Sequence, residues 1–200
     1  MKVLLSTELA PQRPRHVRER SEPEGYLLEP AWSGTRALVR VGHAGPRFLG
    51  YEGEVEASRE LYEAISAEAR CASAIIDGVL VDDWQDERDL EVDDEGNAFV
   101  RRAGARQVFV AFDLLEIDGD ALIRVPLLER KRHLEGALVP SVNVRLSAYV
   151  TRGLRQWRDT LAAQGFGRVV LKDWNSVYAP GETNDTWLVV EKIKSGERGP

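Results

Sequence analysis

Short runs of β-branched and aromatic residues, separated by glycine-containing turns, dominate the chain from residue 26 onwards and predict many β-strands. The run over residues 107–117, QVFVAFDLLEI, has the strongest strand preference and is expected at a sheet centre. The run over 72–83 is expected to be a buried strand that breaks at Asp77-Gly78, with Gly34 and Gly78 serving turns. Further strands are expected over residues 26–32, 35–41, 46–51, 97–102, 143–149, 168–172 and 186–193.

Three stretches have apolar residues at the three- and four-residue spacing of a helix that packs one face on a core. They cover residues 57–70, 126–138 and 151–164. The second is the clearest, because Pro126 suits a first helical turn and Leu127 and Leu134 then follow on one face. Strands with segregated helices predict an α+β domain with antiparallel sheets flanked by helices.

The N-terminal segment, residues 1–25, reads as a polar, proline- and arginine-rich lead-in to the folded domain. Four arginines cluster there beside a histidine: Arg13, Arg15, His16, Arg18 and Arg20. We expect a loop or a mobile arm for them, because charge runs are usually solvated. Residues 26–194 are expected to form a single domain, and residues 195–200 a short tail.

The composition limits the classes of function. With 43% apolar and 30% charged residues, the 200-residue chain is typical of globular proteins, and its one cysteine excludes an internal disulfide. No stretch approaches the ~18 apolar residues that span a bilayer, so we expect no membrane contact and a cytoplasmic location. The three histidines are isolated, without metal-ligand spacing. The net charge of −6 means that any contact with nucleic acid would have to be local.

Five groups of short motifs occur in order along the chain. They are EPAWSGTR at 29–36, IDGV at 76–79, FDLLEIDG at 112–119, PLLERK at 126–131, and a long match over 169–188 with VVLK, NSVYAPG and WL. In this order they resemble the adenylation (nucleotidyltransferase) domain of ATP-dependent DNA ligases of the bacterial repair type, over about residues 26 to 194. The resemblance implies a ligase and capping-enzyme type of α+β fold, which is ATP-grasp-like, with ATP as the nucleotide.

The same resemblance locates a departure in the first motif. In these ligases the motif is Glu-Pro-Lys-Trp-Asp-Gly-x-Arg, and its lysine attacks the α-phosphate of ATP. Ala31 stands at that position, and the methyl group of alanine cannot act as a nucleophile. Ligation by the usual route is therefore not expected.

Five more positions that carry chemistry in the family are changed. Ser33 replaces an aspartate, while Val79 and Gly167 stand where the family has glutamates near the ribose and the divalent ion. Val189 and Glu191 occupy two lysine positions that stabilise the phosphates and the leaving pyrophosphate. Because Mg²⁺ prefers carboxylate oxygens, we expect no Mg²⁺ site, no metal ligands and no catalytic residues at these positions.

Part of the nucleotide pocket is retained. By the resemblance, Phe112 stacks on adenine and Arg36 lies near the ribose and phosphate, while Lys172 ends the fourth motif. Glu29 and Trp32 flank the lost nucleophile. Two structural explanations compete with these assignments: Phe112 as a core residue and Lys172 as a surface residue of a strand.

Two functions fit this pattern. The first is a ligase-like pseudoenzyme, a degenerate adenylation domain kept as a nucleotide-binding or scaffold module in DNA repair. The second is an active ligase or nucleotidyltransferase that uses a displaced lysine, Lys172 or Lys192, or a partner subunit. Lys192 follows Val189 at an odd offset, which in a strand points the two side chains to opposite faces.

The partner and the oligomeric state stay open at this point. DNA is one candidate partner, and a repair or nucleoid protein that docks on the arginine-rich segment and the acidic run over residues 82–95 is another. The oligonucleotide-binding-fold domain that follows in such ligases is not expected, because the chain ends a few residues after the last motif.

Overall fold

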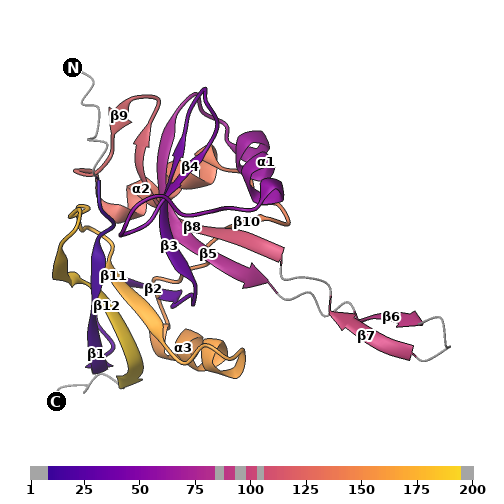
Figure 1. The fold of residues 1–200 in the computed structure, drawn as a ribbon. Helices are drawn as coiled ribbons and strands as arrows, with labels where there is room; N and C mark the ends of the chain where they lie inside the picture. The colour runs from indigo at the N-terminus through magenta and orange to yellow at the C-terminus, as the bar shows by residue number, and fades with distance from the viewer. Residues whose placement is uncertain (1–8, 84–87, 93–97, 103–105, 195–200) are drawn as a thin grey trace, which may run out of the picture.

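The computed structural model of the chain describes residues 9–83, 88–92, 98–102 and 106–194 (Figure 1). Its strands are β1 Arg13–Ser21, β2 Tyr26–Pro30, β3 Thr35–Val41, β4 Arg47–Leu49, β5 Ala74–Asp83, β6 Arg88–Val92, β7 Ala98–Arg102, β8 Arg106–Ile117, β9 Asp120–Ala121, β10 Val144–Leu146, β11 Val169–Asp173 and β12 Thr183–Lys194. Its helices are α1 Arg59–Glu68, α2 Leu127–Ala137 and α3 Leu154–Ala163. The expected strands and helices are all present, most of them with ends shifted by one or a few residues.

The strands form two large sheets and a hairpin. One sheet has the order β1-β12-β11-β2, and the six-stranded sheet has the path β10-β8-β5-β3-β4 with β9 beside β8. Most neighbours are antiparallel, as expected, while β1 with β12 and β10 with β8 are parallel. In Figure 1 the β6–β7 hairpin stands away from the rest of the domain. Part of the acidic run over residues 82–95 lies in β6, and residues 84–87 and 93–95 lie outside the described residues.

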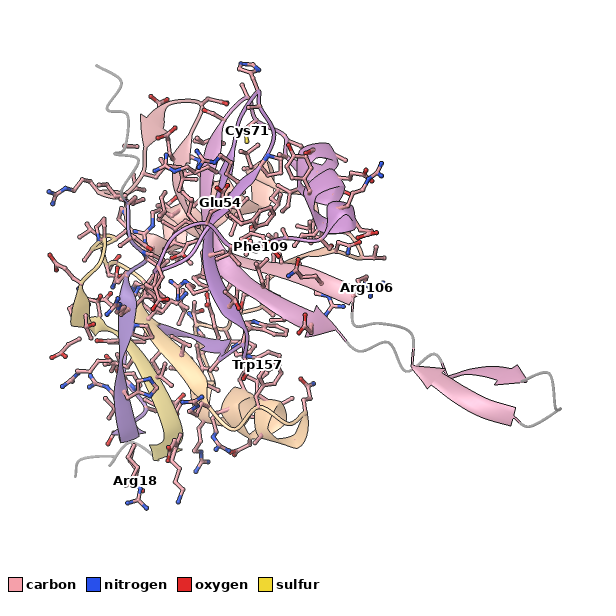
Figure 2. The ribbon with its side chains drawn as sticks, viewed as in Figure 1. Arg18, Glu54, Cys71, Arg106, Phe109 and Trp157 are labelled. Atoms are coloured by element: carbon pink, nitrogen blue, oxygen red, sulfur yellow. The ribbon has the colours of Figure 1, made fainter. Side chains whose placement is uncertain are left out.

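The basic N-terminal segment is a strand, which corrects the expectation of a loop or a mobile arm. β1 runs parallel to the final strand, with His16 opposite Val189. Just before it, Gln12 is fully buried, and its backbone N–H donates to the Tyr178 hydroxyl at 2.8 Å. Figure 2 shows the labelled Arg18 pointing outward from this edge strand. The segment is ordered by backbone pairing and not by burial of an apolar face, so its local composition gave no strand signal.

The two faces of the four-stranded sheet bury different clusters, because successive side chains of a strand point to opposite faces. On one face, Leu28, Leu171 and Leu188 pack with Leu154 and Leu161 of α3. The alternate positions of the same strands face the six-stranded sheet and include Leu27 and Trp187, which join a second cluster. A third cluster packs α1 and α2 on the other face of the six-stranded sheet.

β5 continues through Asp77-Gly78, which corrects the expected break. The pairing of β5 with β8 instead shifts register between these two residues. A Cβ atom on Gly78 would lie 2.4 Å from the Phe109 ring, and one on Gly34 would lie 2.0 Å from the Leu80 carbonyl oxygen. Neither glycine has a positive φ. Gly78 lies inside β5 and serves close approach between strands and not a turn, whereas Gly34 lies in the bend between β2 and β3, as expected, and also approaches β5 closely.

Replacing Gly78 by alanine should therefore destabilise the domain by about 1–3 kcal/mol, since the added methyl group overpacks the β5–β8 contact. Gly136 in α2 is the matched control, because a Cβ there meets nothing within 4 Å. Gly136→Ala should leave stability unchanged or raise it by up to about 1 kcal/mol. Urea unfolding of both variants measures the difference, and equal midpoints would contradict the packing argument.

The Asp-Gly pair that ends the FDLLEIDG motif forms a tight turn after β8. Asp118 and Gly119 have φ values of 50° and 83° and join β8 to β9 as a two-residue hairpin. Positive φ at both residues is the geometry that such tight hairpins need and that Asp-Gly provides. No helix within the described ranges is long and apolar enough to cross a membrane.

Candidate functional site

A cavity of about 230 Å³ lies between the two large sheets. Eight positions singled out in the sequence line it: Glu29, Ala31, Trp32, Arg36, Val79, Phe112, Lys172 and Val189. The remaining lining residues are Pro14, His16, Pro30, Arg168, Val170 and Trp187. Residues from both ends of the chain thus line one cavity, from Pro14 to Val189.

A second hollow, of about 330 Å³, lies beside the first and holds most of the remaining changed positions. Ser33 and Gly167 line it, and Ala31 and Arg168 line both hollows. The sixth changed position, Glu191, lines neither, and its backbone carbonyl accepts a hydrogen bond from the Arg158 guanidinium at 2.6 Å. Five of the six changed positions therefore line these two neighbouring hollows.

Lys172 is buried at the cavity wall, which corrects its interpretation as a surface residue. Its Nζ lies 2.9 Å from a carboxylate oxygen of Glu29 and 4.0 Å from the ring centroids of both Phe112 and Trp187. Lys131 of α2 pairs with the same carboxylate and donates to the Phe112 carbonyl oxygen at 3.0 Å. Two cations thus share one buried anion, and the cluster carries an excess positive charge whenever both lysines are protonated.

Burial sets the proton affinities in this cluster. Removal from water lowers the pKa of Lys172 to about 8, and the charge of Lys131 acts in the same direction, while Glu29 partly opposes both. Burial by itself would raise the pKa of Glu29, but the two ammonium groups hold it below its ordinary value. Glu29 is therefore an ionised carboxylate that is already paired with both lysines.

Arg36 is held by a second buried network. Its Nε and Nη2 donate to the two oxygens of Asp77 at 2.6 and 2.7 Å, and the Tyr178 hydroxyl donates to the same carboxylate at 2.7 Å. Burial opposes the guanidinium charge, yet the adjacent carboxylate raises the pKa of Arg36 above its ordinary value. Burial and Asp77 likewise raise the pKa of Tyr178. Arg36 lines the cavity but is already committed to Asp77.

Phe112 is a core residue that also lines the cavity. Its ring belongs to the apolar cluster between the sheets and lines the cavity at the same time. It packs edge-on against Trp187 at 6.2 Å, and the Arg36 guanidinium lies 4.4 Å from its centroid. The aromatic wall is therefore flanked by the cations of both buried networks.

The cavity does not fit a divalent cation. Among the described residues that line it, Glu29 is the one carboxylate, and it is paired with two lysines. Across the described part of the chain, no three aspartate, glutamate, histidine or cysteine side chains gather as a metal site requires. A hard cation such as Mg²⁺ would need free oxygen ligands that these side chains do not supply.

The sequence missed three residues of the site. Trp187 was noted as part of a motif but given no role, although its ring forms a wall of the cavity. His16 gave no local signal, because it reaches the cavity through the pairing of β1 with β12. Arg168 lay between two motif residues, and its position beside Ala31 appears only when β2 and β11 pair.

Known proteins provide an independent comparison. The sequence profile of the family described as ATP dependent DNA ligase domain matches residues 13–194. A DNA ligase of Methanothrix thermoacetophila is 29% identical over 187 residues, which cover 88% of this chain and 34% of that protein. The multifunctional non-homologous end joining protein LigD of Mycolicibacterium smegmatis is 26% identical over 164 residues, covering 82% of this chain and 21% of LigD. The chain spans about a third or less of these relatives.

Solved ligase structures share the fold. The ligase domain of M. tuberculosis LigD superposes with a TM-score of 0.67 at 24% identity, over 90% of this chain and 58% of that one. Mycobacterial DNA ligase D complexed with ATP and MES superposes with a TM-score of 0.69 at 24% identity, over 92% of this chain and 60% of that chain. The bacteriophage T7 ATP-dependent ligase complexed with ATP superposes with a TM-score of 0.58 at 16% identity, over 92% of this chain and 69% of that chain. The expected α+β nucleotidyltransferase fold is confirmed, and this chain belongs to the ATP dependent DNA ligase domain family.

Proposed function

We propose that this chain is a ligase-type adenylation domain that binds a nucleotide without forming a covalent lysyl-nucleotide, and that it serves as a binding or scaffold module in DNA repair. One observation carries the proposal. Ala31, at the family's nucleophile position, lines a cavity that still has an aromatic wall and buried cations. A site of this kind can hold a nucleotide, but the methyl group beside it cannot attack a phosphate.

The distribution of changed and retained motif residues supports the same proposal. Changes are concentrated at the two hollows, where side chains would meet a ligand. Retained motif residues such as Asp77, Asp113 and Tyr178 form buried ion pairs and hydrogen bonds that hold the sheets together. This is the pattern expected when selection maintains the fold and no longer maintains the nucleotidyl transfer.

The similar proteins suggest which ligand and which partner to propose for this chain. Two of the similar structures are ligases complexed with ATP, so an adenine nucleotide is the ligand proposed here. Phe112, Trp187 and Trp32 offer aromatic surface for its base. The curated relatives are DNA ligases, and DNA is accordingly the proposed macromolecular partner.

The second candidate function is nucleotidyl transfer from a displaced lysine. A pKa lowered to about 8 favours it, because more of the Lys172 amine is then neutral and nucleophilic than in an ordinary lysine. Against it, the amine is paired with Glu29 and enclosed by two aromatic rings. Lys192 is exposed and does not line the cavity, which argues against the other displaced lysine.

Incubation with α-labelled ATP and Mg²⁺, followed by a denaturing gel, separates the two functions. We expect no labelled 22.4 kDa band from the natural chain. We also expect none from Ala31→Lys, because the restored amine would still lack the family's carboxylates at 79 and 167 and its lysines at 189 and 191.

A labelled band from the natural chain that disappears in Lys172→Met would establish the second candidate function and overturn the first. A band that appears with Ala31→Lys would show that one substitution alone had silenced a working site. A ligase adenylation domain with its lysine intact, assayed in parallel, verifies that the labelling conditions work.

A further inference from the structure

Arg168 lies where the two hollows meet. Pro30 pairs with Val169 between β2 and β11, and the next hydrogen bond runs from the Ala31 N–H to the Arg168 carbonyl at 3.3 Å. Arg168 therefore stands across from Ala31. Its side chain is exposed and lines both hollows, and no hydrogen bond or ion pair with another described residue holds its guanidinium. This cation is available to a ligand at the position where the family nucleophile would stand.

The local charge differs from that of the motif which this segment resembles. Gly167 stands where that motif has a glutamate, and residues 167–170 read Gly-Arg-Val-Val. A carboxylate that could bind a cation is absent at Gly167, and the next residue brings a guanidinium. Arginine suits phosphate because its planar fork donates two parallel hydrogen bonds. The exchange removes a ligand for a metal and adds a ligand for an anion.

His16 supplies a second donor from the opposite edge of the sheet. One row across the sheet runs from His16 through Val189 and Val170 to Glu29, and all four residues line the cavity. The His16 side chain is exposed, and no other described residue is bonded to it. Arg168, the residue before β11, and His16 of β1 thus line the same cavity, with the apolar Val189 and Val170 between them.

Size and charge limit the length of the phosphate chain. The cavity of about 230 Å³ is smaller than the ~300–1,000 Å³ of most ligand sites, which favours a small nucleotide. The antiparallel pairing of Val169 with Val190 brings Glu191 next across from Arg168, and its exposed carboxylate would repel each added phosphate. This repulsion is smallest for one phosphate and largest for a triphosphate.

We infer that the cavity binds a nucleoside monophosphate without a divalent ion, with Arg168 and His16 holding the phosphate in place of the metal. This inference rests on the proposed nucleotide-binding function and adds the ligand class and its mode of binding to it. The base would lie against the aromatic wall, and the phosphate would lie at the mouth beside Ala31.

Titration calorimetry with AMP, ATP and adenosine, each with millimolar Mg²⁺ and again with EDTA, tests the inference. We expect the Kd for AMP to change less than about twofold on removal of Mg²⁺. Arg168→Gln should weaken AMP binding about 10-fold or more, because a charge-assisted hydrogen bond contributes about 1.5–3 kcal/mol. It should leave adenosine binding unchanged, which also shows that the variant is folded.

Two further variants complete the experiment. Arg152→Gln removes an exposed arginine that precedes α3 and lines neither hollow, and it should change the binding of none of the three ligands. Glu191→Gln should strengthen the binding of ATP more than that of AMP, because it removes a negative charge that repels the phosphate chain.

The outcomes distinguish this inference from the function on which it rests. Binding of AMP that needs Mg²⁺, or that is equal in Arg168→Gln and Arg152→Gln, overturns the inference and leaves nucleotide binding intact. Failure of all three ligands to bind at millimolar concentration overturns both.

Discussion

Replacing Arg130 by methionine is expected to lower the free energy of unfolding by about 3–5 kcal/mol, because it leaves the buried Asp113 carboxylate without its counter-ion. Both side chains are fully buried. The guanidinium donates to the two oxygens of Asp113 at 2.8 and 2.7 Å, and to the carbonyls of Val125 and Ser176 at 2.6 and 3.0 Å. Guanidinium chloride unfolding, followed by tryptophan fluorescence, measures the loss.

Arg132→Met is the matched control on the same helix. Arg132 pairs with Glu129 three residues earlier, with side chains that are 60% and 49% exposed, and such surface pairs contribute less than about 1 kcal/mol. A double variant, Arg130→Met with Asp113→Leu, should recover much of the lost stability, because no unpaired charge then remains buried. Equal unfolding midpoints for Arg130→Met and Arg132→Met would refute the role of the buried pair.

This pair gives three of the motifs a structural role. Asp113 belongs to the FDLL motif, Arg130 to the PLLERK motif and Ser176 to the NSVYAPG motif. Their side chains and backbone bond to each other in the interior, so the fold requires them whether or not nucleotidyl transfer takes place. Their presence identifies the family and carries no information about activity.

Lys172 should make the domain more stable as the pH rises from about 8 to 10. The folded-state pKa is about 8 and the ordinary value is 10.5, so in this window the unfolded chain binds a proton that the folded chain has released. The free energy of unfolding then rises with pH by up to about 1.4 kcal/mol per unit. Below about pH 8 both states are protonated, and the buried charge costs the folded state its full penalty of about 3 kcal/mol.

Lys172→Met isolates this effect, because it removes the titrating group and keeps an apolar side chain of similar length. The difference in unfolding free energy between the two proteins should change by about 3 kcal/mol between pH 7 and pH 10.5. Cys71 and Tyr178, whose pKa values are raised by burial, titrate in both proteins and cancel in the difference. Parallel pH profiles for the two proteins would mean that Lys172 is hydrated and keeps an ordinary pKa.

Local pattern was sufficient for most of the strands, for the helices and for the tight turn. The run over residues 107–117 became the long strand β8, Pro126 opened α2, and Asp118-Gly119 formed the hairpin with positive φ at both residues. These features depend on side-chain volume, periodicity and backbone preference within a few residues, and the sequence displays all three. The alanine at position 31 was equally plain, because no fold can give a methyl group an amine's chemistry.

Contacts between distant residues decided the rest. β1 is a strand because it pairs with β12, and Gln12 is buried because it bonds Tyr178, 166 residues later. Lys172 is buried, and its pKa is lowered, because residues of β2, β8 and β12 enclose its side chain. Its neighbours in sequence suit a surface strand equally well. The meeting of Ala31 with Arg168 required β2 and β11 to pair. The sequence by itself determined the family and the alanine at position 31. The tertiary structure alone decided which charges are buried and paired, because burial and pairing depend on residues that only folding brings together.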